Sequence, residues 1–152
     1  MKKTIFLSLL SLVSICSSAQ VTGADGLYYN DDQTLYSGIV NTKNAGGDQS
    51  MTAQVFEGQL HGDVVFYHSN GKIAEQGHYA MGKKDGKWQQ FNEQSVLTGE
   101  AFYRSGLKDG VWTVWDDNGI KRYHMVYAMG KKVDVWKMWD EDSNLVSERI
   151  YE

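Results

Sequence analysis

Proline is absent from the 152 residues, and cysteine occurs once, at Cys16. A chain without proline has no residue that removes a backbone donor, which suits an array of paired strands. A single cysteine excludes a disulfide within these residues. The sequence also lacks the 3.6-residue apolar stripe with capping residues that predicts a long helix. Beyond the N-terminal segment no apolar run is long enough to cross a bilayer.

Positive charge is scarce as well. The chain has 15 basic and 19 acidic residues, and without Lys2 and Lys3 the balance is 13 against 19, a net charge of −6. No basic cluster exceeds two residues such as Lys83-Lys84. This composition argues against nucleic-acid binding, which depends on many phosphate contacts. It also disfavours attraction to anionic lipids, so peripheral membrane binding is the least favoured of the binding functions considered.

The N-terminus has the layout of a secretory signal peptide. A short basic start is followed by an apolar run from Ile5 to Ile15 and by the small residues 17–19. Cleavage after Ala19 would give a mature chain that begins at Gln20. We therefore expect residues 1–19 to direct export across the inner membrane, and the mature protein to be periplasmic or extracellular.

Cys16 offers an alternative, a lipid-modified N-terminus. The residue before it is Ile15, whereas a lipoprotein signal has a small residue there. The sequence favours simple secretion, with the lipoprotein as the alternative.

Residues 58–152 repeat every 24 positions without an insertion. A fixed period of this length indicates one supersecondary unit copied along a line, in which each copy packs against its neighbours. The recurring residues are Gly58, Gly82, Gly106 and Gly130; Gly62, Gly86 and Gly110; Trp88, Trp112 and Trp136; Tyr67, Phe91, Trp115 and Trp139; and Tyr79, Tyr103, Tyr127 and Tyr151. Such arrays are usually binding surfaces.

Each unit reads as a β-hairpin. Residues 111–115 are β-branched and aromatic, residues 116–119 end in Asn-Gly, and residues 120–127 return antiparallel. Asn-Gly tolerates positive φ at both turn centres and is a strong hairpin signal. The sequence predicts an all-β antiparallel meander of stacked hairpins, either an elongated single sheet or a partly rolled one.

The aromatic spacing bears on the faces of this sheet. Trp112 and Trp115 are three residues apart, so either they project from opposite faces or a bulge brings them together. The second strand has one small or apolar face, with Ala101 and, one repeat earlier, Gly77. Small residues there would let rings from adjacent strands lie across the backbone.

The two ends of the chain depart from the repeat. Residues 20–57 are predicted to be a degenerate opening repeat, in which the polar, Gly-rich residues 41–53 form an inserted loop. In the last of the four units Asp134 and Ser143 replace glycine. Atypical end repeats are expected as caps, because their outer face meets water.

No residue pattern indicates catalysis or a cofactor. The four histidines (His61, His68, His78, His124) lack metal-ligand spacing, and no nucleophile elbow, phosphate loop or dinucleotide motif is present. Acidic residues 31–32, 116–117 and 140–142 lie at expected turns, where Asp bonds nearby amides; a weak cation site is the alternative. A triad is defined by geometry and is not excluded by sequence. We expect a protein that is not an enzyme and has neither metal nor cofactor.

The aromatic columns allow two interpretations. The tryptophans 88, 112 and 136 and the tyrosine series are expected to form the core of a thin sheet that has little else to bury. The outer rings Tyr67, Phe91, Trp115 and Trp139 are the candidate partner-binding residues, as a platform for a protein strand, a glycan or a lipid headgroup. A rolled sheet would bury these rings too.

The run G-x-x-x-G-x-W-x-x-(aromatic)-x-x-x-G, at Gly106, Gly110, Trp112, Trp115 and Gly119, resembles the bacterial variant of the MORN repeat (membrane occupation and recognition nexus). Four phased copies cover residues 58–152, although other copies lack the last glycine or the tryptophan.

The resemblance implies a binding and scaffolding module. In eukaryotes such modules are often attached to enzymes and are proposed to contact lipids, and similar bacterial proteins are sometimes labelled antitoxin-like. The predicted export argues against a cytoplasmic antitoxin. We expect a secreted or periplasmic scaffold that binds another protein through an aromatic-rich sheet face. A cell-wall glycan-binding module is the alternative.

Overall fold

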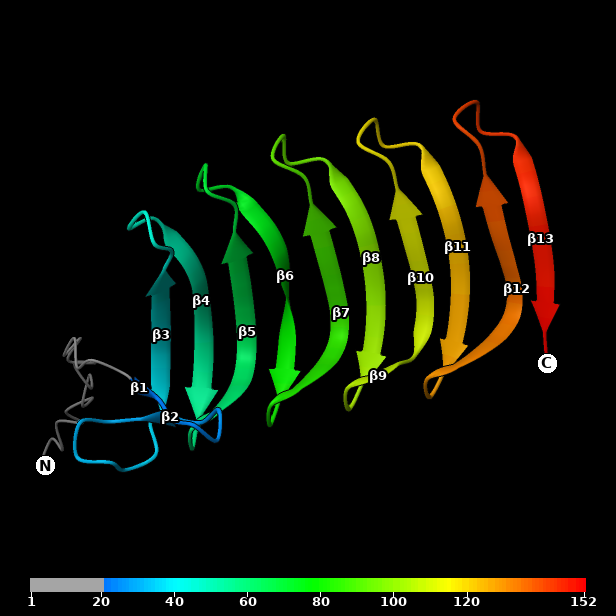
Figure 1. Ribbon diagram of the computed structural model, residues 1–152. Coiled ribbons are helices and arrows are strands. Elements are labelled where there is room, and N and C mark those ends of the chain that lie inside the picture. Colours follow the sequence, from blue (N-terminus) through cyan, green and yellow to red (C-terminus); the bar gives the residue numbers. More distant parts are fainter. Residues whose placement is uncertain (1–20) are drawn as a thin grey trace, which may run out of the picture.

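The computed structural model describes residues 21–152, which form one long, open antiparallel sheet and a small two-stranded sheet beside its first strand (Figure 1). The described residues contain no helix, and hence none that could span a membrane. The predicted signal peptide, with Cys16, lies outside the described residues. The prediction of an all-β meander is confirmed, and the sheet stays open between the edge strands β3 and β13.

The strands follow one another across the sheet in chain order. The small sheet pairs β1 (Val21–Thr22) with β2 (Tyr28–Tyr29). The long sheet consists of β3 (Gly38–Lys43), β4 (Gln49–Phe56), β5 (Gln59–Tyr67), β6 (Ile73–Ala80), β7 (Lys83–Phe91), β8 (Leu97–Arg104), β9 (Leu107–Lys108), β10 (Gly110–Trp115), β11 (Lys121–Ala128), β12 (Lys131–Trp139) and β13 (Leu145–Tyr151). Five hairpins follow from this order: β3–β4, β5–β6, β7–β8, β10–β11 and β12–β13.

Two kinds of turn alternate along the sheet. Within the hairpin β10–β11, the amide of Gly119 donates to the Asp116 carbonyl at 2.9 Å, and Gly119 has φ +79° while Asn118 has no positive φ. The hairpin predicted from Asn-Gly is present, and its loop has three residues, of which only the last is left-handed. In the turns between hairpins both central residues have positive φ, as Met129 (47°) and Gly130 (83°) do.

Each hairpin carries the same bulge. In β10–β11, Val114 faces Tyr123 but Trp115 faces Lys121, which leaves Arg122 as an extra residue. The extra residues recur every 24 positions, at Ser50, Ala74, Thr98, Arg122 and Val146. A bulge bends its strand and increases local twist, which explains the arched second strands in Figure 1.

The prediction of an inserted loop over residues 41–53 is wrong. These residues form the end of β3, a turn, and the first part of β4. The segment is polar in composition because its turn and the outward-facing positions of its strands are polar. The alternating positions Val40, Met51 and Ala53 are buried, as in a strand with one covered face.

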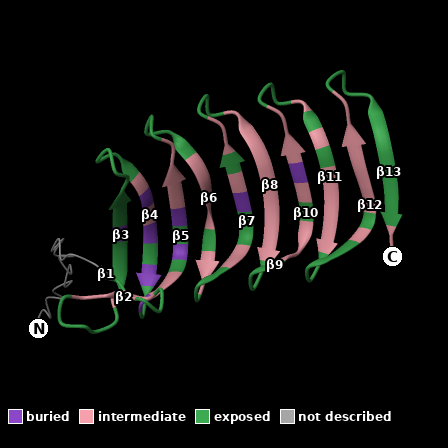
Figure 2. Ribbon diagram, in the orientation of Figure 1, coloured by how far each residue is buried: buried purple, intermediate pink, exposed green. Residues whose placement is uncertain are grey.

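Most of the buried residues lie in the N-terminal half of the long sheet, from β3 to β7 (Figure 2). A hydrophobic cluster there consists of Val40, Met51, Ala53, Val55, Val64 and Trp88. Tyr28 and Tyr36, from a segment we call the N-terminal cap (residues 22–37), pack against it. Backbone hydrogen bonds hold this cap: the Tyr28 amide donates to the Gly58 carbonyl at 2.9 Å, and the Gly58 amide to the Tyr36 carbonyl at 2.8 Å. The cap covers only the N-terminal end of the face on which it packs.

Candidate functional site: an aromatic–lysine ladder

One face of the sheet carries a continuous row of aromatic rings, which we call the ladder. It runs across the strands from β6 to β13 and alternates tyrosine with tryptophan. Successive ring centroids are separated by 5.1 Å (Tyr79–Trp88), 6.3 Å (Trp88–Tyr103), 5.1 Å (Tyr103–Trp112), 5.4 Å (Trp112–Tyr127), 5.1 Å (Tyr127–Trp136) and 5.0 Å (Trp136–Tyr151). All six pairs are tilted or edge-to-face, arrangements that the ring quadrupoles favour over face-to-face stacking.

Each tryptophan lies across the strand before its own. The indole Nε1 groups of Trp88, Trp112 and Trp136 donate to the carbonyls of residues 78, 102 and 126 at 3.2, 3.0 and 3.0 Å. Gly77 lies directly beneath Trp88, where a Cβ atom would overlap the indole. This agrees with the expectation that small residues let the rings lie across the backbone. Trp88 is only 2% exposed, whereas Trp112 and Trp136 are half-buried.

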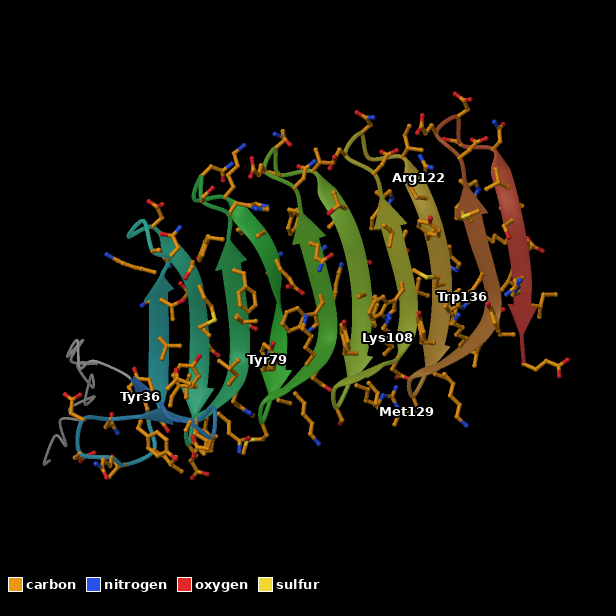
Figure 3. The ribbon with its side chains drawn as sticks, in the orientation of Figure 1. Tyr36, Tyr79, Lys108, Arg122, Met129 and Trp136 are labelled. Carbon is orange, nitrogen blue, oxygen red and sulfur yellow. The ribbon has the colours of Figure 1, made fainter. Side chains whose placement is uncertain are left out.

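A lysine lies over each tryptophan ring. The Nζ atoms of Lys84, Lys108 and Lys132 are 3.6, 4.1 and 4.5 Å from the centroids of the three indoles. The same atoms lie 5.4, 4.8 and 5.3 Å from the next tyrosine rings. A cation over an aromatic face is held by the ring quadrupole. Figure 3 shows Tyr79, Lys108 and Trp136 along one row that crosses the strands.

The three lysines differ in their counter-ions. Lys84 donates to Glu75 Oε1 at 2.7 Å. The residues one, two and three repeats beyond Glu75 are glycine, tyrosine and serine, at positions 99, 123 and 147. Within residues 21–152, Lys108 and Lys132 form no ion pair. The C-terminal part of the ladder therefore presents uncompensated positive charge on an acidic protein.

Tyr79 and Tyr103 of the ladder keep their protons at neutral pH. Burial raises the pKa of Tyr79 and of Tyr103 above the ordinary value of 10.0, and the negative charge of Glu75 adds to both shifts. These hydroxyls are donors at neutral pH.

The ladder face is also hollowed. A depression of about 80 Å³ lies between Trp88 and Trp112, with Gly99 and Ala101 among its lining residues. A second depression lies beside Trp136 and is lined by Tyr123, Met138 and Tyr151, among others. Both are open to solvent and are large enough to receive parts of side chains.

The chemistry of the face changes where the cap ends. Val64 and Leu60 stand one repeat before Trp88 and Lys84, and both contribute to the apolar cluster under the cap. Beyond the cap the same positions are tryptophan and lysine. Among the described residues, the chain thus has aliphatic residues at these positions beneath the cap, and half-buried tryptophans with unpaired lysines farther along the sheet. The buried Trp88 and the paired Lys84 mark the boundary between the two parts.

The predicted partner-binding column lies elsewhere. Tyr67, Phe91, Trp115 and Trp139 are half-buried and each is the last residue of the first strand of a hairpin, at the bulge. Among the described residues they make no ring-to-ring contacts. The structure does not bring these rings into contact with one another, and their role in binding stays a prediction.

The glycine column has a backbone role. Gly62, Gly86 and Gly110 have φ of +108°, +68° and +101°, the left-handed region that glycine enters without steric cost. Asp134 adopts φ +60° at the same phase, so the last unit keeps this conformation without glycine.

The polar residues at the turns bond to the backbone. Asp116 Oδ1 accepts the amides of Asn118 and Ile120, each at 3.0 Å. Hydrogen bonds from the amide and side chain of Asn144 hold the pKa of Asp140 below its ordinary value. His78 Nδ1 lies 3.1 Å from Asp63 Oδ1, and the Met81 amide donates to His61 Nδ1. In the part of the chain that the structure describes, no three potential ligands converge on a metal position.

Sequence reasoning missed the lysines. Positions 84, 108 and 132 keep the 24-residue period and follow the inter-hairpin glycines by two residues. That signal was available in the sequence, but the placement of each ammonium group over a ring depends on the folded geometry.

Comparison with known families supports the resemblance. Residues 60–81 match the family model described as MORN repeat variant. The matched segment contains most of β5, the turn and β6, which is one hairpin of the array. A search of curated proteins gives no match. Residues 60–81 are therefore similar to a MORN repeat variant, and the described residues form an array of β-hairpin repeats.

Proposed function

We propose that this chain is a non-catalytic scaffold that binds another protein on the open part of the ladder face, from β8 to β13. The observation that carries the proposal is the pair Lys108 and Lys132, held over indole rings without a carboxylate partner among the described residues. A partner with acidic side chains would supply the missing counter-ions. Complementary charge of this kind gives specificity and speeds association.

A protein partner fits this face better than a sugar. Glycan binding uses bare ring faces for stacking, whereas the ladder indoles are covered by the chain's own ammonium groups at 3.6–4.5 Å. The depressions beside Trp88 and Trp136 are suited to receive side chains of a partner. Glycan binding through the outer column remains the second candidate, because the half-buried rings of Phe91 and Trp115 carry no such lysine cover.

An exported location belongs to the same proposal. It rests on the basic, apolar and small-residue pattern of residues 1–19. The partner would then be a protein of the cell envelope or the surrounding medium.

The test is capture of envelope proteins by the immobilised mature chain, with matched variants. Lys108→Glu with Lys132→Glu reverses the charge on the ladder face. Lys83→Glu with Lys131→Glu makes the same charge change on the opposite face of the sheet. Each of these lysines directly precedes a ladder lysine in its strand, and neighbouring residues of a strand point to opposite faces.

We expect the first pair of substitutions to abolish capture of a defined partner and the second pair to leave it intact. Equal capture by both variants would contradict the proposal. Retention of purified cell-wall glycan by both lysine variants, together with its loss in Phe91→Ser with Trp115→Ser, would support the glycan alternative.

A further inference from the structure

We infer that the segment bound on the ladder face is an acidic polypeptide in the polyproline II conformation, with a carboxylate at every third residue. This inference rests on the proposed function, because it specifies the partner of the same site. It follows from the pitch of the ladder, from its unpaired donors and from its charge.

The pitch of the ladder sets the spacing of the partner's charges. Lys108 and Lys132 are one repeat apart, so they lie on strands β9 and β12, at equivalent positions of successive hairpins. Strands in a sheet are about 4.8 Å apart, so equivalent positions recur about every 9.6 Å along the array. A polyproline II helix rises about 3.1 Å per residue with three residues per turn, which gives about 9.3 Å per turn. Every third side chain of such a segment would face the ladder in register.

Other peptide conformations match less well. Three residues of a β-strand span about 10 Å, but side chains alternate between its faces, so every third residue points away. An α-helix presents equivalent side chains about every seven residues, or about 10.5 Å, and the mismatch grows along the array.

The ladder also offers what a polyproline II segment requires. Such a segment has no internal hydrogen bonds, so its carbonyl groups need donors from a partner or from water. Tyr103 is protonated at neutral pH, and among the described residues the hydroxyls of Tyr103, Tyr127 and Tyr151 form no hydrogen bond within the chain. Polyproline II segments usually dock in aromatic-lined grooves, and the two depressions of the ladder face are lined by tyrosine and tryptophan rings.

Charge limits the site and excludes one occupant. Glu75 neutralises Lys84 at 2.7 Å, so a carboxylate is attracted to Lys108 and Lys132 rather than to the N-terminal end of the ladder. A second copy of this chain does not fit, because no two of its acidic residues are three positions apart in the sequence and its acidic residues 140–142 are folded into a tight turn. The occupant is therefore a different protein.

The experiment uses labelled peptides and fluorescence anisotropy with the mature chain. The probe is a peptide of repeated Glu-Pro-Pro triplets. One control peptide has the same composition with the glutamates clustered at one end, and a second is a helical peptide with glutamate at every seventh residue. Two partly exposed ion pairs contribute about tenfold in affinity, so Lys108→Glu with Lys132→Glu should weaken triplet binding by at least about tenfold. The control Lys83→Glu with Lys131→Glu should leave it unchanged.

The outcomes separate this inference from the proposed function. Equal binding of the triplet and clustered peptides would show unspecific charge attraction and overturn the inference, as would tighter binding of the helical peptide. If no peptide binds while capture of an envelope protein still depends on Lys108 and Lys132, the inference fails and the proposed function stands. If neither binding nor capture depends on these lysines, both fail.

Discussion

Gly77→Ala tests how the rings of the ladder are packed. A Cβ atom at residue 77 would overlap the indole of Trp88, which is 2% exposed. That ring is fixed from several sides: Nε1 donates to the His78 carbonyl at 3.2 Å, and the Tyr79 ring lies edge-on at 5.1 Å. The indole therefore has to shift as a unit, or the backbone of β6 has to move away from it.

The expected loss follows from two opposing effects. Overpacking of a well-packed site costs about 1–3 kcal/mol. Replacement of glycine by alanine at an ordinary φ stabilises by about 0.4–1 kcal/mol, because the unfolded chain loses freedom. We therefore expect Gly77→Ala to lower the free energy of unfolding by about 1–2 kcal/mol. Complete removal of the ring in Trp88→Ala sets the upper limit, about 3–5 kcal/mol.

The assay is urea denaturation followed by far-ultraviolet circular dichroism, with Gly99→Ala as the matched control. Gly99 lies on the same face with an ordinary φ, and the tightest contact of its Cβ would be with Oε1 at the end of the Gln90 side chain, at 3.1 Å. That side chain can rotate, so the control should be neutral or slightly stabilised. Equal stability of Gly77→Ala and the unmodified chain would refute the packing described for Trp88.

Three further predictions concern single positions. Gly110 has φ +101°, so Gly110→Val should melt well below Gly110→Asn, which tolerates the left-handed region; equal melting temperatures would contradict this. Trp112→Ala should lower the free energy of unfolding by about 2–3 kcal/mol in denaturant titrations, less than the loss of a fully buried ring, because Trp112 is half-buried. Trp136→Ala should cost less still, because β12 is next to the edge strand; a larger loss at Trp136 would contradict this order. Asp140 has a lowered pKa, so its stabilising effect is present above the unfolded value of 3.8 and is lost as pH falls through the folded value. Asp140→Asn should keep the turn, as Asn92 does, but should be slightly less stable than the unmodified chain at neutral pH because it lacks the charge. It should also lose less stability on acidification, and equal acid sensitivity in thermal melts would count against this role.

Local features of the fold could be predicted from the sequence. The period of 24, the β-branched and aromatic runs and the turn glycines together predict stacked hairpins, because turn geometry and strand propensity act over a few residues. The positive φ of Gly110 and the small residue beneath Trp88 follow from the same short-range sterics. The sequence alone also contains the spacing of the lysines, although it does not place them over rings.

The tertiary structure alone decided which parts of the sheet are covered. Residues 41–53 look like a loop in composition, and only the packing of the cap residues Tyr28 and Tyr36 against Val40 and its neighbours explains their burial. The open, arched sheet depends on a bulge in each hairpin, whose register no local pattern specifies. The missing counter-ions of Lys108 and Lys132 likewise depend on which side chains meet across strands. Such contacts join residues far apart along the chain, and short-range periodicity carries no information about them.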